Sequence, residues 1–267
     1  GARPDYHRQG DRMFIKDYNK TALIIGDTKI LYAEVIEKVR QYSTLIDISR
    51  GERCAIFFEN RPEWVYTFFA GWNTGVINVP IDMMSTAGEV THIINDCSPK
   101  LVFTSDKNLP RLTEALKKVK KKPRIINVDH LPKFGNAAKV KDYSPDMQEI
   151  VLLLYTSGTT GKSKGVMLSF ENLWVNVRWN NDNKRVNIND TMIAILPFHH
   201  SWPLMATLLC PMDCGSEIVF IRELNADEIM TAMKKNHVTM ITAVPRLFEM
   251  FHRAIVSKIN RSAAART

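Results

Sequence analysis

A loop of small and hydroxyl residues follows an apolar run near the middle of the chain. The run is residues 151–155, VLLLY, which is typical of a short strand buried on both faces. The residues after it are Thr156, Ser157, Gly158, Thr159, Thr160 and Gly161. Glycines let a ligand approach the backbone closely, and successive N–H groups and hydroxyls bind anionic oxygens. Because Lys162 and Lys164 follow at once, the sequence predicts a polyphosphate site whose hydroxyls can also face a magnesium ion.

Two other interpretations of this loop stay open. Gly161-Lys162-Ser163 reproduces the second half of the Walker A pattern G-x-x-x-x-G-K-[ST], which is typical of P-loop nucleoside triphosphatases. However, Thr156 stands where that pattern needs its first glycine, and residues 165–169 predict a strand where a P-loop begins a helix. The remaining alternative is a glycine-rich hairpin without a ligand. Steady ATP hydrolysis in the absence of a carboxylate would favour the P-loop enzyme.

Residues 155–165, YTSGTTGKSKG, resemble the signature YTSG-[ST]-TG-x-PKG of the ANL adenylate-forming superfamily. This family comprises acyl-CoA synthetases, peptide-synthetase adenylation domains and beetle luciferases. Ser163 stands in place of the usual proline, and Lys164 keeps the register of the family lysine. Other segments resemble the first, second and fourth core motifs of the family, namely residues 30–46, 68–105 and 196–220. The resemblance therefore covers nearly the whole chain, and it is closest to the fatty acyl-CoA synthetases.

The resemblance implies a reaction in two steps. A carboxylate, expected to be a long- or medium-chain fatty acid, attacks the α-phosphate of Mg-ATP to give an acyl-adenylate and pyrophosphate. The thiol of coenzyme A then displaces AMP. The expected cofactors and co-substrates are therefore ATP, Mg²⁺ and coenzyme A. No general base is required, because a carboxylate is already ionised at neutral pH.

The same resemblance assigns roles to individual residues. The groups expected to bind the β- and γ-phosphates of ATP are the side chains of Thr156, Ser157, Thr159 and Thr160 and the N–H groups of Gly158 and Gly161. Lys164 is expected to compensate the phosphate charge, and Thr156 to be a magnesium ligand. His200 is expected to lie between the nucleotide and the acyl site and is the candidate catalytic residue. A structural role is the alternative for His200 and the preferred role for its neighbour His199.

Strands and helices alternate along the chain, which predicts an α/β fold with mostly parallel strands. A hairpin is expected around the turn Gly26-Asp27. Residues 129–149 are polar, contain prolines and show no periodicity, so we predict a linker there. An N-terminal α/β subdomain is then expected over residues 1–128, and a second one with the pyrophosphate loop over residues 150–267. The resemblance implies the N-terminal part of an acyl-CoA synthetase-like fold, with stacked sheets and flanking helices.

The chain has 267 residues, of which 45% are hydrophobic, and a formal net charge of +8. Much of the positive charge lies at residues 117–124, behind apolar residues at helical spacing, and this predicts an amphipathic helix with a solvated basic face. A basic nucleic-acid-binding protein is the competing class. It is disfavoured because no recognition motif is found and the aromatic residues fall in apolar patterns. Contact with an anionic membrane surface stays open.

The cysteines and the hydropathy pattern indicate the environment of the protein. Cys54, Cys97, Cys210 and Cys214 form no C-x-x-C pair, so buried free thiols are expected and a zinc site is not. No apolar stretch approaches the roughly 20 residues that cross a bilayer, and the first residues do not read as a signal peptide. We therefore expect a cytoplasmic protein.

The resemblance covers only about the first half of a family enzyme. Three family features find no match up to Thr267: the YG-x-TE segment, the TGD-type aspartate for the ribose and the late catalytic lysine. We therefore expect the N-terminal portion of a ligase, which folds but does not turn over by itself. Its apolar surface near Phe248, Met250 and Phe251 is expected to be uncovered and to favour self-association, such as a homodimer.

Overall fold

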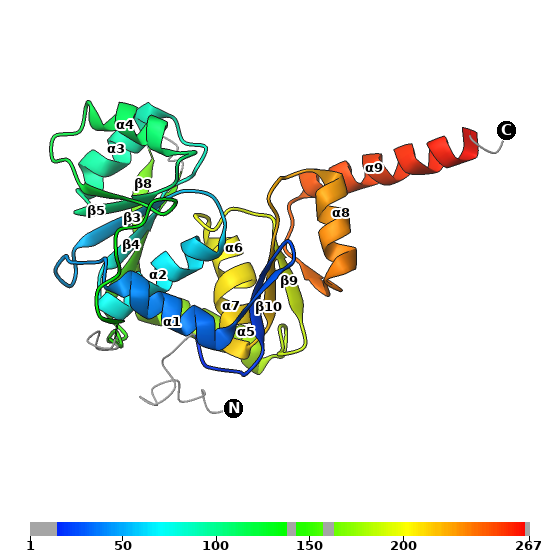
Figure 1. Cartoon of the computed structure of the whole chain (residues 1–267), viewed down its shortest axis with the longest axis horizontal. Coiled ribbons are helices and arrows are strands. Elements are labelled where there is room, and N and C mark those ends of the chain that lie inside the picture. The colour runs from blue at the N-terminus through cyan, green and yellow to red at the C-terminus, as the bar shows by residue number, and fades with distance from the viewer. Residues whose placement is uncertain (1–14, 138–142, 157–162, 265–267) are drawn as a thin grey trace.

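The protein consists of two β-sheets with helices around them, as the computed structural model shows (Figure 1). The structure describes residues 15–137, 143–156 and 163–264. The six-stranded sheet has the order β6-β5-β3-β4-β7-β8, and the five-stranded sheet has the order β11-β9-β10-β1-β2. Neighbouring strands are parallel except in the pairs β7–β8 and β1–β2. The expected α/β fold with mostly parallel strands is confirmed.

The six-stranded sheet carries the predicted phosphate loop. Its strands are β6 (Arg124–Asn127), β5 (Leu101–Thr104), β3 (Arg53–Phe57), β4 (Ile77–Pro80), β7 (Ile150–Thr156) and β8 (Lys164–Ser169). Val151, Leu152 and Leu154 of β7 are buried, as the apolar run predicts, and the strand pairs with β4 and β8. Because β8 is a strand, the prediction for the segment after the loop is confirmed. A strand at this place counts against a P-loop, which leads into a helix.

The five-stranded sheet begins with the predicted hairpin. Its strands are β11 (Met240–Ile241), β9 (Thr191–Ala194), β10 (Glu217–Phe220), β1 (Thr21–Ile25) and β2 (Thr28–Leu31). Gly26 in the turn has a φ of 60°, a conformation that glycine adopts without steric cost. β1 pairs in parallel with β10, so that Leu23 lies opposite Ile218. Each sheet contains strands from before and after residues 129–149, so the sheets do not coincide with the two predicted subdomains. The division of the chain at this segment stays a prediction.

The helices cover the sheets and join them. They are α1 (Tyr32–Ser43), α2 (Pro62–Thr74), α3 (Ala87–Cys97), α4 (Leu109–Leu116), α5 (Phe170–Asp182), α8 (Ala226–Lys235) and α9 (Pro245–Ala264). Between β9 and β10, α6 (Ser201–Pro203), a π-helical segment (Leu204–Leu209) and α7 (Cys210–Cys214) follow one another without a break. Figure 1 shows α6 and α7 in the middle of the molecule and α9 extending away from it. Within the described part of the chain, no helix is long and apolar enough to cross a membrane.

Aromatic side chains on α2 form much of the main core. Trp64, Phe68, Phe69 and Trp72 are all buried, and the helix begins at Pro62, where a missing N–H costs nothing. The same core includes residues of both sheets, for example Leu23 of the five-stranded sheet and Leu152 of the six-stranded one. Both sheets are thus fixed to one continuous apolar core, which sets the position of their ends relative to each other.

All four cysteines are free, and Cys54, Cys97 and Cys210 are buried. Burial raises the pKa of Cys97 to about 11 and that of Cys210 to about 12, so both are uncharged thiols at neutral pH. In the residues that the structure describes, no three acidic, histidine or cysteine side chains are grouped to hold a metal ion. The prediction of buried free thiols is confirmed for these three cysteines, whereas Cys214 is half-buried.

Helix α9 carries the apolar residues that were expected to be uncovered. Phe248 is 55% exposed, whereas Met250 and Phe251 pack against the small core beside β9 and β10. Self-association through this surface stays a prediction.

The contact between α2 and β4 gives a first test of the packing. A Cβ atom added to Gly71 would lie 2.1 Å from Oδ1 of Asn78, which is fully buried and donates from Nδ2 to the carbonyl of Phe68. Neither the backbone of α2 nor that of β4 can move freely in the core, so the added methyl group would clash with Asn78. Gly71→Ala is therefore expected to lower the free energy of unfolding by about 1–3 kcal/mol. The measurement is urea unfolding. Gly88→Ala is the matched control, because it is also helical but its nearest neighbour is 3.9 Å away; equal losses in both variants would contradict this packing.

Candidate active site

The hairpin β7–β8 brings two of the predicted site residues together. Thr156, the last residue of β7, lies opposite Lys164, the first residue of β8, and both side chains are exposed. Ser157, Gly158, Thr159, Thr160 and Gly161 lie outside the described residues. The predicted phosphate and magnesium roles of the loop therefore stay predictions. The described ends of the hairpin place a hydroxyl and an ammonium group side by side at the mouth of the loop.

A cleft of about 860 Å³ opens beside this hairpin. Its walls come from three distant parts of the chain: the segment from Pro80 into α3, the hairpin ends Thr156 and Ser163, and the pair His199-His200 after β9. Thr156 and His200, which were predicted from separate motifs, therefore line one cleft. Lys164 is opposite Thr156 in the hairpin but is not among the residues that line the cleft. This volume is in the range of small-molecule and cofactor sites.

The two histidines differ in their surroundings. Their rings lie 3.9 Å apart between centroids, and His200 is exposed at the start of α6. The His199 side chain is only 10% exposed; its Nε2 is 3.6 Å from Oδ2 of Asp82 and has no hydrogen-bond partner among the residues that the structure describes. Burial, opposed by Asp82 and aided by His200, lowers the pKa of His199 to about 4. His199 is thus neutral at pH 7, and the exposed His200 is the histidine that a ligand in the cleft can reach.

Helix α3 contacts both arms of the hairpin, which the sequence did not reveal. Nε2 of His92 is 2.9 Å from the carbonyl oxygen of Ser163, and the hydroxyl of Tyr155 donates to Oδ2 of Asp96 at 2.5 Å. Burial, together with the bond to Asp96, raises the pKa of Tyr155, so its hydroxyl keeps the proton that it donates. Because His92 and Asp96 are four residues apart on one helix, they share a face, and this spacing was the available signal. These contacts fix the hairpin ends against the wall of the cleft.

The residues present are compatible with Mg²⁺ bound together with a phosphate group. Magnesium prefers oxygen ligands and is usually held by one or two protein oxygens plus substrate phosphates. The cleft offers the hydroxyl of Thr156 and the carboxylate of Glu89. Thr156 as the ligand remains a prediction.

The buried His199 gives a prediction for acid stability. Its folded pKa of about 4 lies below the ordinary value of 6.5, so the unfolded chain takes up the proton first as the pH falls. The contribution of neutral His199 to the free energy of unfolding is complete above pH 6.5 and decreases toward pH 4. At pH 5 the free energy of unfolding is lower by about 2 kcal/mol. Denaturant unfolding at pH 7 and pH 5 should show a smaller loss in His199→Gln than in the wild type. His252→Gln, an exposed histidine on α9, is the control, and an unchanged pH dependence in His199→Gln would contradict the burial effect.

The fold is an α/β architecture of two sheets, and its cleft is lined by the hairpin end Thr156 and by the pair His199-His200 after β9. The chain belongs to the AMP-binding enzyme family, whose model matches residues 14–266. This confirms the membership in the adenylate-forming superfamily that the motifs predicted.

Individual proteins show the same similarity. The chain is 26% identical to 4-coumarate–CoA ligase 1 of Solanum tuberosum over 250 residues, which are 86% of this chain and 46% of that protein. The O-succinylbenzoate coenzyme A synthetase of Bacillus subtilis, in complex with ATP and magnesium, superposes with a TM-score of 0.75 at 26% identity, covering 85% of this chain and 47% of that one. A fatty acyl CoA synthetase of Mycobacterium tuberculosis has the same fold, with a TM-score of 0.76 at 20% identity over 86% of this chain and 47% of that one. The chain spans about half the length of these relatives.

Proposed function

We propose that the whole protein is an ATP-dependent acid–thiol ligase. The carboxylate oxygen attacks the α-phosphorus of Mg-ATP, the bond to the β-phosphate oxygen breaks, and acyl-adenylate and pyrophosphate form. The thiol of coenzyme A then attacks the acyl carbon, AMP leaves with the carboxylate oxygen, and the thiol proton is released. The observation that carries the proposal is the shared cleft of Thr156 and His200, because it joins the predicted phosphate hairpin to the predicted acyl entrance.

The chain's own residues have separate tasks in this scheme. Thr156 and Lys164 bind and neutralise the pyrophosphate that leaves, together with the loop between them. Since charge moves onto this leaving group in the transition state, fixed donors and positive charge there lower the barrier. His200 orients the carboxylate at the other side of the cleft. His199, neutral and buried behind it, supports the ring of His200 by direct contact.

The substrate within this reaction is a narrower proposal. We propose a long- or medium-chain fatty acid, because the motifs of the chain resemble those of the fatty acyl-CoA synthetases most closely. The discriminating experiment compares kcat/KM of the whole protein for fatty acids of different length with kcat/KM for 4-coumarate, the compound in the name of the Solanum tuberosum relative. A preference for 4-coumarate would contradict the fatty-acid proposal and leave the ligase reaction intact. We also propose that the protein is located in the cytoplasm and that it contacts a membrane surface or a second copy of itself.

The product of ATP cleavage tests the reaction class. A ligase of this type forms AMP and pyrophosphate, and it does so only when a carboxylate is present. A P-loop enzyme forms ADP and phosphate without a carboxylate. Chromatography of the nucleotide products of the whole protein, with and without a fatty acid, separates the two outcomes.

A further inference from the structure

An asparagine after β3 reaches across to the segment that carries the histidines. Asn60 lies between β3 and α2, and its side-chain amide makes one hydrogen bond on each side of Pro197. Nδ2 donates to the carbonyl of Leu196 at 2.8 Å, and Oδ1 accepts from the N–H of Phe198 at 3.1 Å. Since β9 ends at Ala194, this stretch of backbone is beyond the strand and is held by the amide of Asn60.

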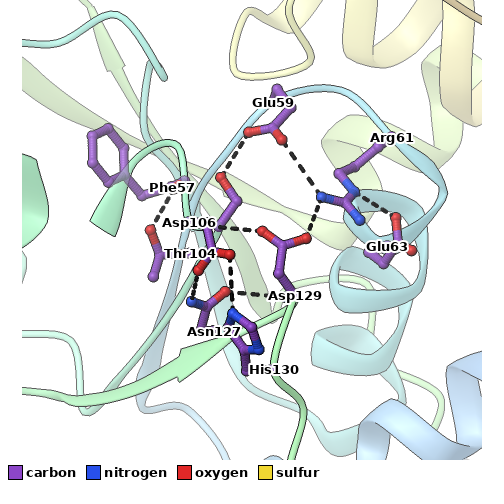
Figure 2. A network of polar contacts seen from close by, with 10 residues as sticks. Phe57, Glu59, Arg61, Glu63, Thr104, Asp106, Asn127, Asp129 and His130 are labelled. Carbon is purple, nitrogen blue, oxygen red and sulfur yellow. Dashed lines mark hydrogen bonds and ion pairs between the residues drawn. The ribbon is translucent and has the colours of Figure 1, made fainter. Parts of the chain in front are cut away.

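The two neighbours of Asn60 belong to a polar network at the carboxyl ends of β3, β5 and β6 (Figure 2). The hydroxyl of Ser105 donates to Glu59 at 2.8 Å. Nη1 of Arg61 is 2.7 Å from Oδ1 of Asp129 and 3.5 Å from Oε1 of Glu59. Figure 2 shows Glu59 and Arg61 pointing toward the same group of side chains. The loop that presents Asn60 is therefore fixed on both sides.

The charges of this network are stable at neutral pH. Burial alone would lower the pKa of Arg61, but its hydrogen bonds and ion pairs with Glu63 and Asp129 raise it above the ordinary value. Burial opposes ionisation of Asp129 as well, yet the N–H of Asp106 and the guanidinium of Arg61 hold its pKa below the usual range. Buried or half-buried ion pairs with complete partners restrain geometry more than they add stability. Their effect here is to keep residues 59–61 in one conformation.

We propose that Asn60 is a positioning residue that holds the Leu196–Phe198 backbone so that His199 and His200 face the cleft. Its effect on the rate rests on the proposed function, whereas its effect on the histidines does not. Phe198 is also packed against Trp64, 5.1 Å between ring centroids, which anchors the side chain but leaves the backbone groups to Asn60. A displacement of about 1 Å at a reacting group can cost about 100-fold in rate. Loss of Asn60 should therefore act through His200.

The variant Asn60→Ala tests this role in the whole protein. The expected result is a fall in kcat/KM for the carboxylate of about 10- to 100-fold, with little change in KM for ATP. The double variant Asn60→Ala/His200→Ala should be no slower than His200→Ala alone, because both changes remove the same orientation. Asn95→Ala is the matched control, since the Asn95 side chain also bridges two backbone groups, the carbonyl of Lys118 and the N–H of Lys120, but belongs to α3 and makes no bond to Leu196 or Phe198.

An NMR titration of the histidines gives a readout that does not need activity. In Asn60→Ala the pKa of His199 is expected to rise from its low value toward 6.5, because the ring becomes more exposed, while Asn95→Ala leaves it unchanged. Should Asn60→Ala not fold, Asn60→Gln is measured instead, which keeps an uncharged amide but displaces it by one methylene from Leu196 and Phe198. An unchanged His199 titration, or losses of rate that add fully in the double variant, would overturn the proposal. Absence of any carboxylate-dependent activity would overturn the proposed function, and the titration would still decide the role of Asn60.

Discussion

Lys164→Ala is expected to slow formation of the acyl-adenylate by about 100- to 1,000-fold in the whole protein. Lys164 begins β8 opposite Thr156, at the mouth of the loop predicted to hold the β- and γ-phosphates. The negative charge of the departing pyrophosphate develops there in the first step only. Conversion of a supplied acyl-adenylate and coenzyme A to the thioester should therefore change far less. Pyrophosphate-exchange and single-turnover thioester assays measure the two steps separately.

A lysine of the other sheet provides the control for this prediction. Lys29→Ala removes an exposed positive charge from the edge strand β2 of the five-stranded sheet, so it tests the effect of charge alone. It should leave both steps unchanged. Equal losses in both steps for Lys164→Ala would contradict the assignment of Lys164 to the pyrophosphate.

His200→Ala is expected to impair use of the carboxylate more than binding of ATP. The ring lines the same cleft as the hairpin end, and its loss is expected to remove orientation of the acyl group while the phosphate contacts remain. We expect kcat/KM for the carboxylate to fall about 10- to 100-fold, with the affinity for ATP within about threefold of the wild type. Steady-state kinetics with varied fatty acid and calorimetry with Mg-ATP measure the two effects.

The exposed His252 on α9 serves as the control for His200. His252→Ala should change neither quantity, because α9 extends away from the molecule in Figure 1. Unchanged fatty-acid kinetics in His200→Ala would return this histidine to a structural role. A weakened affinity for ATP with unaltered carboxylate use would place it on the nucleotide side of the cleft.

The local elements of this fold were predictable because neighbouring residues determine them. The apolar run before Thr156 can only be a buried strand, and Gly26 permits the turn of the β1–β2 hairpin. Asn225 caps α8, because its side chain accepts from the N–H of Glu228 at 2.8 Å. Each signal lies within a few residues of the structure that it specifies.

The assembly of the sheets was not predictable in the same way. Pairing of β1 with β10 joins Leu23 to Ile218, and no local pattern specifies which parallel strand is the neighbour. The predicted subdomains follow the order of the chain, whereas the strand order crosses residues 129–149. The main core, which includes residues of both sheets, explains this arrangement, because apolar burial depends on the total surface covered and not on sequence distance.

The site was predictable only as far as its motifs. Thr156, Lys164 and His200 were found because their motifs resemble those of the family, and the structure places Thr156 and His200 on one cleft. His92, Asp96 and Asn60 were missed since their partners are far away in the sequence, so that their roles depend on the tertiary fold. A structural role was also the preferred prediction for His199. The burial and low pKa of His199 agree with a supporting position behind His200.

The fate of the carboxylate oxygen distinguishes the proposed ligase reaction from other routes of ATP cleavage. If the carboxylate attacks the α-phosphorus of ATP and the thiol later breaks the acyl carbon–oxygen bond, one carboxylate oxygen ends in AMP. The whole protein is incubated with a fatty acid labelled with ¹⁸O in its carboxyl group, ATP, Mg²⁺ and coenzyme A, and the products are analysed by mass spectrometry. The proposed ligase reaction predicts one ¹⁸O in AMP and none in pyrophosphate. Unlabelled AMP, or ADP and phosphate formed without the fatty acid, would contradict it.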